Sequence, residues 1–173
     1  ADLAAHAHPR QLLGVGLEFD QRAVRQPHPG VADPLRPVQQ ELEAELANLY
    51  GVDAALTFVS GHATNVTTLG YLFGPKDLIL HDSLIHNSAL EGIRLSGAAR
   101  RSFEHNNLDA LENLLKELRH KFERVLIITE GLYSMDGDTP DLKKLVSLKQ
   151  QYKAFLMVDD AHALGVLGQT GKG

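Results

Sequence analysis

The chain contains no cysteine in 173 residues. That absence excludes disulfides, thiolate metal sites and a cysteine nucleophile, and it is typical of a cytoplasmic protein, which we expect here. No apolar run approaches the roughly 20 residues that a membrane-spanning helix needs, and the first residues lack a basic-then-apolar signal pattern. Long basic runs are also missing, and the formal net charge is -5. We therefore expect neither a membrane nor a nucleic acid as partner.

The composition is that of a folded globular protein, with 43% hydrophobic and 23% charged residues. Most of the prolines fall within residues 1–37, which show no sustained hydrophobic period. We predict that 1–37 is an irregular N-terminal arm and that 38–173 is part of one domain.

From residue 38 onward, helical and strand patterns alternate. After a helix over 38–51, strands are expected at 54–60, 77–82, 99–105, 124–130 and 154–160, with helices at 62–73, 87–97, 108–122 and 142–152. Short apolar strands that alternate with helices predict an α/β fold in three layers, a mainly parallel sheet with helices on both faces.

Polar residues follow four of the expected strands, in the segments "SGHATN", "HDSLIHNS", "TEGLYSMDGD" and "DDAHALGVLG". Ligands of open parallel sheets bind outside the carboxyl ends of the strands. Four polar strand ends on one edge therefore indicate an active site.

Taken singly, each segment allows an ordinary structural interpretation. Ser60 and Gly61 could expose backbone N–H groups to a phosphate or could simply cap a helix. His86 could be a stacking group, an acid or base, or a helix-start residue. Asp136 and Asp138 could form a turn or a weak cation site. Asp159 could be a desolvated carboxylate with a cationic partner or a helix cap.

Taken together, the segments resemble the α-oxoamine synthases, a family of pyridoxal-phosphate (PLP) enzymes. "SGHATN", "DSLIHNS", "TEGLYSMDGD" and "VDDAHALGVLGQTGKG" match the family in order and spacing, from about Glu41 to Gly173. The resemblance implies the fold-type I large domain and a homodimer. It also implies decarboxylative condensation of an amino acid with an acyl-CoA or acyl-carrier-protein thioester to give an α-aminoketone.

The resemblance also implies roles for individual residues. Asp159 would pair with the pyridine nitrogen of PLP, His162 with its phenolic oxygen, and His86 would stack on the ring and place the substrate. The remaining cofactor contacts would come from Gly61, His62 and Ser134, and Glu130 would brace the cluster from behind.

The family's Schiff-base lysine lies beyond the "DDAH" strand, and the small domain follows it. We therefore expect this chain to be a part of the large domain that is inactive by itself. Lys172 occupies a position where the family usually has arginine, so we do not assign it as the Schiff-base lysine.

Three positions depart from the family pattern, namely His62 for an aromatic residue, Asn87 in "HNS" for "HAS", and Gln39 for a histidine. The motifs favour either the members that make 8-amino-7-oxononanoate in biotin formation or a synthase domain of a polyketide-type assembly line. Two alternatives stay open: a non-catalytic fragment or degenerate homologue that binds a phosphate-bearing ligand, and a metal hydrolase that uses His86, Asp159, Asp160 and His162.

Overall fold

Four parallel strands form the sheet of the computed structural model, which describes residues 36–173. They are β1 (Leu78–Asp82), β2 (Ala99–Phe103), β3 (Val125–Glu130) and β4 (Phe155–Asp159). Their order across the sheet is β2-β1-β3-β4, and every neighbouring pair is parallel. The α/β class predicted from the alternating pattern is confirmed.

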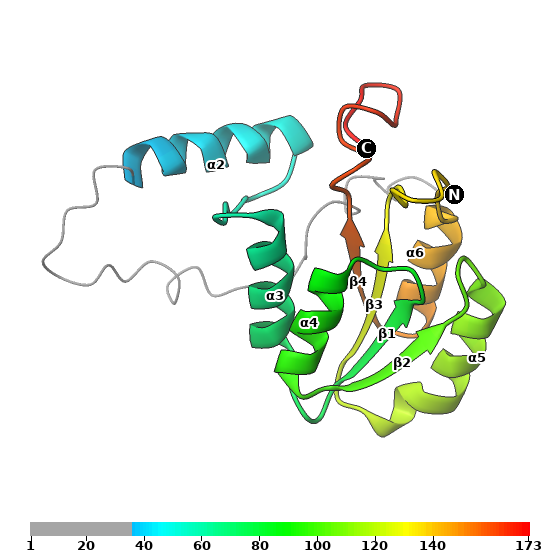
Figure 1. Cartoon of the computed structure of the whole chain (residues 1–173). Coiled ribbons are helices and arrows are strands. Elements are labelled where there is room, and N and C mark those ends of the chain that lie inside the picture. Colours follow the sequence, from blue (N-terminus) through cyan, green and yellow to red (C-terminus); the bar gives the residue numbers. More distant parts are fainter. Residues whose placement is uncertain (1–35) are drawn as a thin grey trace, which may run out of the picture. The chain divides into compact units, whose positions relative to one another are not determined.

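Helices cover both faces of this sheet, which gives three layers (Figure 1). On one face lie α3 (Gly61–Leu72) and α4 (Asn87–Ser96), and on the other lie α5 (Leu108–Leu118) and α6 (Leu142–Gln151). A 3-10 turn, η2 (Arg119–Lys121), follows α5. Within residues 36–173, no helix has the length and apolar character needed to cross a membrane.

Local sequence chemistry explains where the helices begin and end. Ser60, Asn107 and Asp141 are N-caps whose side chains accept a hydrogen bond from a first-turn N–H group of α3, α5 and α6. Gly97 caps the C-terminal end of α4, and its φ of 70° lies in the left-handed region that glycine adopts without strain. The observed bounds of the helices and of β1 to β4 lie within two residues of the predicted ones, except that α5 ends four residues before its predicted end.

Alternation along the strands sorts the side chains onto the two faces of the sheet. Leu78 and Leu80 of β1 and Val125 and Ile127 of β3 point toward α5 and α6, where they form a core with leucines of both helices. The next residues along each strand point toward α3 and α4. Neighbouring positions in one strand therefore serve two separate layers.

Strand β2 forms the edge of the sheet, although its sequence "ARRSF" is largely polar. Arg100 and Arg101 are exposed. Charged side chains on an edge strand are a common protection against pairing with other chains. The third strand expected from the sequence is therefore present, in an edge position that explains its composition.

The chain divides into two compact units, Ala1–Thr57 and Phe58–Gly173, and the sheet belongs to the second. The described part of the first unit contains α2 (Arg36–Tyr50), which has no buried residue. The helix predicted over 38–51 is thus present, and it begins two residues earlier. Most of the predicted arm over 1–37 lies outside the described residues.

The strand predicted over 54–60 is wrong. These residues form neither helix nor strand, and Val59 is 97% exposed. The backbone N–H group of Thr57 donates to the Glu43 carboxylate (2.8 Å), and so does the Thr57 hydroxyl (3.0 Å). A strand needs a neighbouring strand for its backbone groups, and none of the four described strands pairs with this segment.

Candidate functional site

Asp159 ends β4 at the carboxyl edge of the sheet, and its half-buried carboxylate is held by two donors. One oxygen accepts from the side-chain amide of Asn65 (2.8 Å), and the other accepts from the backbone N–H group of Ala161 (3.2 Å). Asn65 lies on α3, so the helix and the strand tip fix one another. The carboxylate is oriented without any cationic partner among the described residues.

A chain of hydrogen bonds leads from Asp159 to His86. Asn65 also donates to the hydroxyl of Ser88 (2.9 Å), and that hydroxyl lies 2.7 Å from Nδ1 of His86. The same Nδ1 accepts from the backbone N–H group of Ser88 (3.2 Å). Because Nδ1 accepts, the neutral ring carries its proton on Nε2. Two residues predicted at different strand ends are therefore joined through Asn65 and Ser88.

His86 is the N-cap of α4, and its side chain is exposed. The helix-start interpretation, one of those left open by the sequence, describes its observed position. That position also fixes the orientation of the ring at the edge that carries Asp159. Capping therefore leaves Nε2 as the ring nitrogen that can donate to a ligand.

Glu130 ends β3, and it is paired in register with Asp159. The two carboxylates consequently lie on the same face of the sheet. Glu130 is buried, and burial together with the nearby Asp159 charge raises the pKa of its carboxyl, although a hydrogen bond from the backbone of His86 opposes that shift. Glu130 therefore lies beside Asp159 and accepts a hydrogen bond from the backbone of His86.

Gly61 and His62 occupy the first turn of α3, one turn before Asn65. The first N–H groups of a helix have no acceptor within the helix, and the Ser60 side chain takes that of Ala63 (3.1 Å). The imidazole of His62 points to Glu91 on α4, at 3.1 Å. The backbone of Gly61 and His62, rather than the His62 ring, can therefore face an anion at this edge.

The two remaining predicted residues lie in loops. His162 is exposed in the turns after β4, close enough to lower the pKa of the Glu130 carboxyl. Ser134 is exposed in the turn after β3. Among the described residues, no hydrogen bond joins either side chain to Asp159 or His86. The fold brings together Asp159, Glu130, His86 and the start of α3, and it leaves Ser134 outside that cluster.

Sequence reasoning missed Asn65 and Ser88, the two residues that connect the cluster. Both are buried, with exposures of 7% and 1%. Asn65 lies four residues before the buried Leu69, so helical spacing alone places a polar side chain on the inner face of α3. A buried asparagine needs hydrogen-bond partners, so a polar residue at a core-facing helical position is the signal by which Asn65 could have been found.

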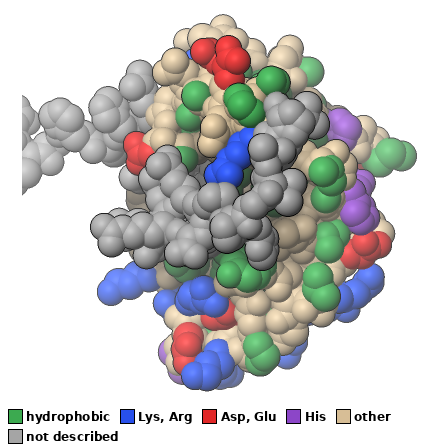
Figure 2. Space-filling model, turned by 90° about the vertical axis from the view of Figure 1, so that its left-hand side faces the viewer, with side chains coloured by type: hydrophobic (Ala, Val, Ile, Leu, Met, Phe, Trp, Pro, Cys, Tyr) green, Lys and Arg blue, Asp and Glu red, His purple; other side chains and the backbone are tan. Residues whose placement is uncertain are grey.

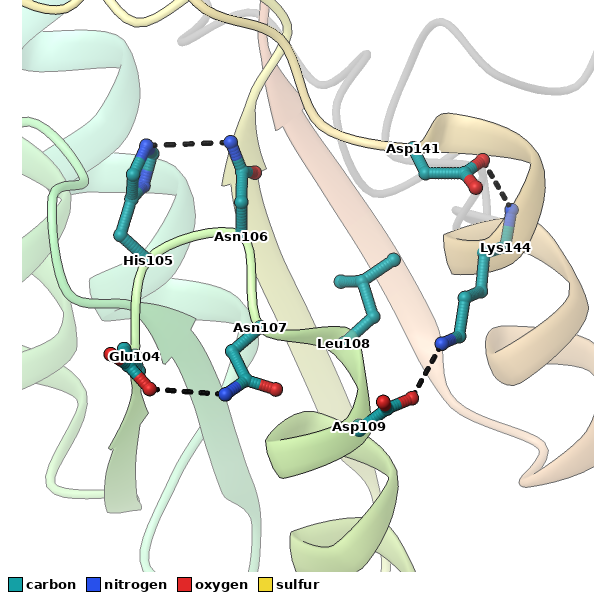
Figure 3. A pocket seen from close by; sticks show the side chains of 8 residues that line it. All are labelled: Glu104, His105, Asn106, Asn107, Leu108, Asp109, Asp141 and Lys144. Carbon is teal, nitrogen blue, oxygen red and sulfur yellow. Dashed lines mark hydrogen bonds and ion pairs between the residues drawn. The ribbon is translucent and has the colours of Figure 1, made fainter.

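The metal-site alternative and one further pocket concern parts of the described residues outside this cluster. No group of three or more His, Asp or Glu side chains in 36–173 is placed to hold a metal ion, so the structure gives the metal hydrolase no support. An open pocket of about 510 Å³ lies between the starts of α5 and α6 (Figure 3). It lies on the opposite face of the sheet, and its cation Lys144 is paired with Asp109 (2.6 Å).

Comparison with known proteins identifies the family. Residues 32–172 match the family described as aminotransferase class I and II. Over 137 residues the chain is 47% identical to an 8-amino-7-oxononanoate synthase of Chlorobaculum parvum, a match that covers 79% of this chain and 35% of that protein. A putative 8-amino-7-oxononanoate synthase of Aquifex aeolicus is 44% identical over 132 residues, covering 76% and 35%.

Solved structures agree in fold. A serine palmitoyltransferase from S. paucimobilis with a bound PLP–myriocin aldimine superposes with a TM-score of 0.73 at 32% identity, covering 77% of this chain and 33% of that one. An 8-amino-7-oxononanoate synthase from Francisella tularensis gives 0.69 at 32% identity, covering 83% and 39%.

The chain belongs to the aminotransferase class I and II family. Within that family it is a homologue of the α-oxoamine synthases, the group that contains 8-amino-7-oxononanoate synthase and serine palmitoyltransferase. The resemblance seen in the motifs is confirmed. The chain spans about 35% of the length of the curated relatives that it matches.

Proposed function

We propose that the protein carrying this segment is a PLP-dependent α-oxoamine synthase, which condenses an amino acid with an acyl thioester and releases carbon dioxide. The observation that carries the proposal is the hydrogen-bonded chain from Asp159 through Asn65 and Ser88 to His86. It places an oriented carboxylate and an oriented imidazole at the carboxyl edge of the sheet. Relatives whose structures hold PLP support the cofactor.

The residues at this edge fit PLP in their chemistry. A carboxylate that already accepts from Asn65 and Ala161 has further acceptor capacity, and it can hold a proton at a pyridine nitrogen. The N–H groups of Gly61 and His62, at the positive end of α3, suit a phosphate. When bound, PLP supplies an electron sink for the pair left by a departing amino-acid proton.

Each residue then has a defined task. Asp159 holds the proton on the pyridine nitrogen, and Asn65 keeps its carboxylate aimed. His86 would stack on the PLP ring when it is bound, and its Nε2 would orient the amino-acid substrate. We assign His162 to the phenolic oxygen and Ser134 to a polar contact that requires its loop to approach. Glu130 supports the cluster through the backbone of His86.

The proposal extends to partners. The substrates are an amino acid and an acyl-CoA or acyl-carrier-protein thioester, and the working form is a homodimer. The curated relatives of this chain favour an enzyme of the 8-amino-7-oxononanoate synthase type. His62 and Asn87, which depart from the family pattern, favour a carrier-protein thioester as the acyl donor. Turnover of the full-length protein with matched CoA and carrier-protein thioesters separates the two donor classes.

The test of the assignment is Asp159→Asn in the full-length protein. A neutral amide cannot hold the pyridinium proton, so the variant should keep bound PLP but lose exchange of the substrate Cα proton by about a hundredfold or more. PLP absorbance and proton NMR in deuterated water report the two properties separately. Asp136→Asn, at an exposed loop position, is the control and should exchange normally. Wild-type exchange in Asp159→Asn would remove Asp159 from the mechanism.

A further inference from the structure

A second polar cluster lies on the opposite face of the sheet from Asp159, and it is centred on His105. The ring follows β2 and lies between two carboxylates: Nδ1 is 2.9 Å from Asp82 at the end of β1, and Nε2 is 2.9 Å from Asp138 in the loop after β3. The Asp82 side chain is 1% exposed, whereas that of Asp138 is 43% exposed. His105 therefore connects three strand ends.

Asn106 reinforces both of these contacts. Its backbone N–H group donates to Asp82 (2.9 Å), and its side-chain amide donates to the Asp138 oxygen that faces His105 (2.7 Å). Its φ of 54° lies in the left-handed region, which asparagine tolerates better than most residues. The turn at His105 and Asn106 is thus shaped to reach two carboxylates at once.

One carboxylate at each ring nitrogen favours the doubly protonated ring, and the Asn106 amide nitrogen, which lies 3.3 Å from Nε2, donates to the nearer Asp138 oxygen (2.7 Å). An ionised carboxylate only accepts, so bonds from both ring nitrogens require both to carry a proton, which is the imidazolium form. Burial lowers the pKa of His105, but Asp82 and Asp138 outweigh it and the net pKa is raised. The ring of Tyr133 is the other titratable group that contacts the imidazole in the described residues, with the two ring centroids 4.5 Å apart and the planes nearly perpendicular. Glu104, the neighbouring carboxylate, bonds to Asn107 instead (Figure 3).

The loop after β3 is held by hydrogen bonds within the loop and by the contact of Asp138 with His105. The N–H group of Tyr133 donates to the carbonyl of Asp138 (3.0 Å), and that of Gly137 donates to the carbonyl of Tyr133 (2.8 Å). The Tyr133 hydroxyl lies 2.9 Å from that of Thr129 in β3. Outside these tethers the turn is exposed, and it carries Ser134. Asp138, the last residue of the loop, is therefore the residue through which the loop is attached to the end of β2.

We propose that His105 is a positioning residue that fastens the loop of residues 131–138 to the ends of β1 and β2. It thereby sets how far Ser134 can extend toward the face of the sheet that carries Asp159. The part that concerns Ser134 rests on the proposed function. The fastening itself rests on the contacts of His105, Asp82 and Asp138 alone.

The contact of His105 with Asp138 should weaken as pH rises. Because the folded pKa of His105 is raised, its stabilising effect is complete below the ordinary histidine value and is lost as pH rises through the folded value. A neutral ring has one N–H group and can satisfy one carboxylate only. Asp82 is buried and costs more to leave without this donor, so Asp138 is the carboxylate that loses its bond to His105 and keeps only the bond from Asn106.

The test is made on this chain without cofactor, by NMR titration of the histidine rings and by amide hydrogen exchange corrected for its intrinsic pH dependence. We expect His105 to titrate above the ordinary value. Protection of the Gly137 and Tyr133 amides should fall by about tenfold or more through the same midpoint, as expected for loss of a charged hydrogen bond. His105→Gln should lower that protection at acidic pH and flatten its profile.

His120→Gln is the matched control, because His120 is exposed in η2 and should leave the loop profile unchanged. A His105 that titrates below its ordinary value, or loop protection equal in His105→Gln and wild type, would overturn the proposal. If His105→Gln does not fold, the wild-type coupling of titration and protection decides alone. None of these measurements involves PLP, so this proposal and the proposed function can fail independently.

Discussion

Asp159 and Asn65 are separated by 94 positions in the sequence, and their hydrogen bond defines the candidate site. The position of Asp159 was predictable, because an apolar run that ends in a carboxylate marks a strand tip. Its partner was not, because no local pattern tells which helix crosses which strand end. The sequence therefore indicated Asp159 and His86 as candidate site residues, and it missed the amide of Asn65 and the hydroxyl of Ser88 that orient their side chains.

Glu130 offers a test at the scale of one residue. Its folded pKa is raised, so between the ordinary and the raised value the folded state binds more protons than the unfolded state. Stability must then fall as pH rises through that window. Glu130→Gln keeps an acceptor for the His86 N–H group and removes the buried charge, so it should raise the free energy of unfolding at about pH 8 more than at about pH 4.

Urea denaturation of the variant and of wild type at the two pH values measures this difference. Glu117→Gln is the control, because Glu117 is exposed on α5 and its pair with Lys121 is long at 3.8 Å. It should shift stability by no more than about 0.5 kcal/mol at either pH. Equal stabilities of Glu130→Gln and wild type at about pH 8 would show that the carboxylate carries no burial cost.

At the scale of elements, agreement between sequence and structure depended on what each segment packs against. Four leucines of α5 recur at helical spacing and lie in the core, so the hydrophobic period alone was enough to locate that helix. Residues 54–60 have the apolar content of a strand, but the Thr57 backbone bonds to Glu43 instead of to a ladder. Apolar content predicts burial, and only the rest of the fold decides whether a neighbouring strand exists.

Two glycines inside helices give a matched test of the α3–α4 contact. A Cβ at Gly92 would lie 2.7 Å from the Asn65 carbonyl oxygen and 3.1 Å from Val66 Cα, both backbone atoms. A Cβ at Gly70 would meet the Leu95 side chain at 2.7 Å, which can move. Gly92→Ala should force the helices apart and cost about 1–3 kcal/mol. Gly70→Ala should range from neutral to about 1 kcal/mol more stable, because alanine favours helix.

Thermal unfolding of both variants checks the contrast in stability. Because Asn65 moves with α3, Gly92→Ala should also perturb the NMR amide signals of Asp159 and Ser88, whereas Gly70→Ala should leave them in place. A Gly92→Ala protein as stable as Gly70→Ala would mean that the two helices are not held at the observed separation.

At the scale of the whole chain, the described surface carries large apolar side chains among charged ones (Figure 2). Tyr71 on α3 is 81% exposed and Leu95 on α4 is 68% exposed, and Leu95 lies against Gly70, the residue before Tyr71. Exposed apolar neighbours favour association. We therefore expect this chain by itself to self-associate, with a sedimentation coefficient that rises with protein concentration.

Replacing both Tyr71 and Leu95 with glutamine should weaken that concentration dependence in sedimentation velocity. Met135→Gln is the control for exposure alone, since Met135 is 92% exposed in the loop after β3. A chain that sediments as a monomer over the whole concentration range would contradict the expectation. Equal effects of the control and the double variant would assign the association to another surface.

Strand β3 ends in Thr129, which contacts the His105 side of the sheet through Tyr133, and Glu130, which contacts the Asp159 side. The two clusters can therefore vary by point substitution almost independently in evolution. Insertion or deletion of a single codon within β3 is a different event, because it exchanges the faces of every residue beyond it. One such change would send Glu130 toward α5 and Thr129 toward α3, and both clusters would be lost together. Lineages of this fold should accept length changes in the loops after the strands, but not within them.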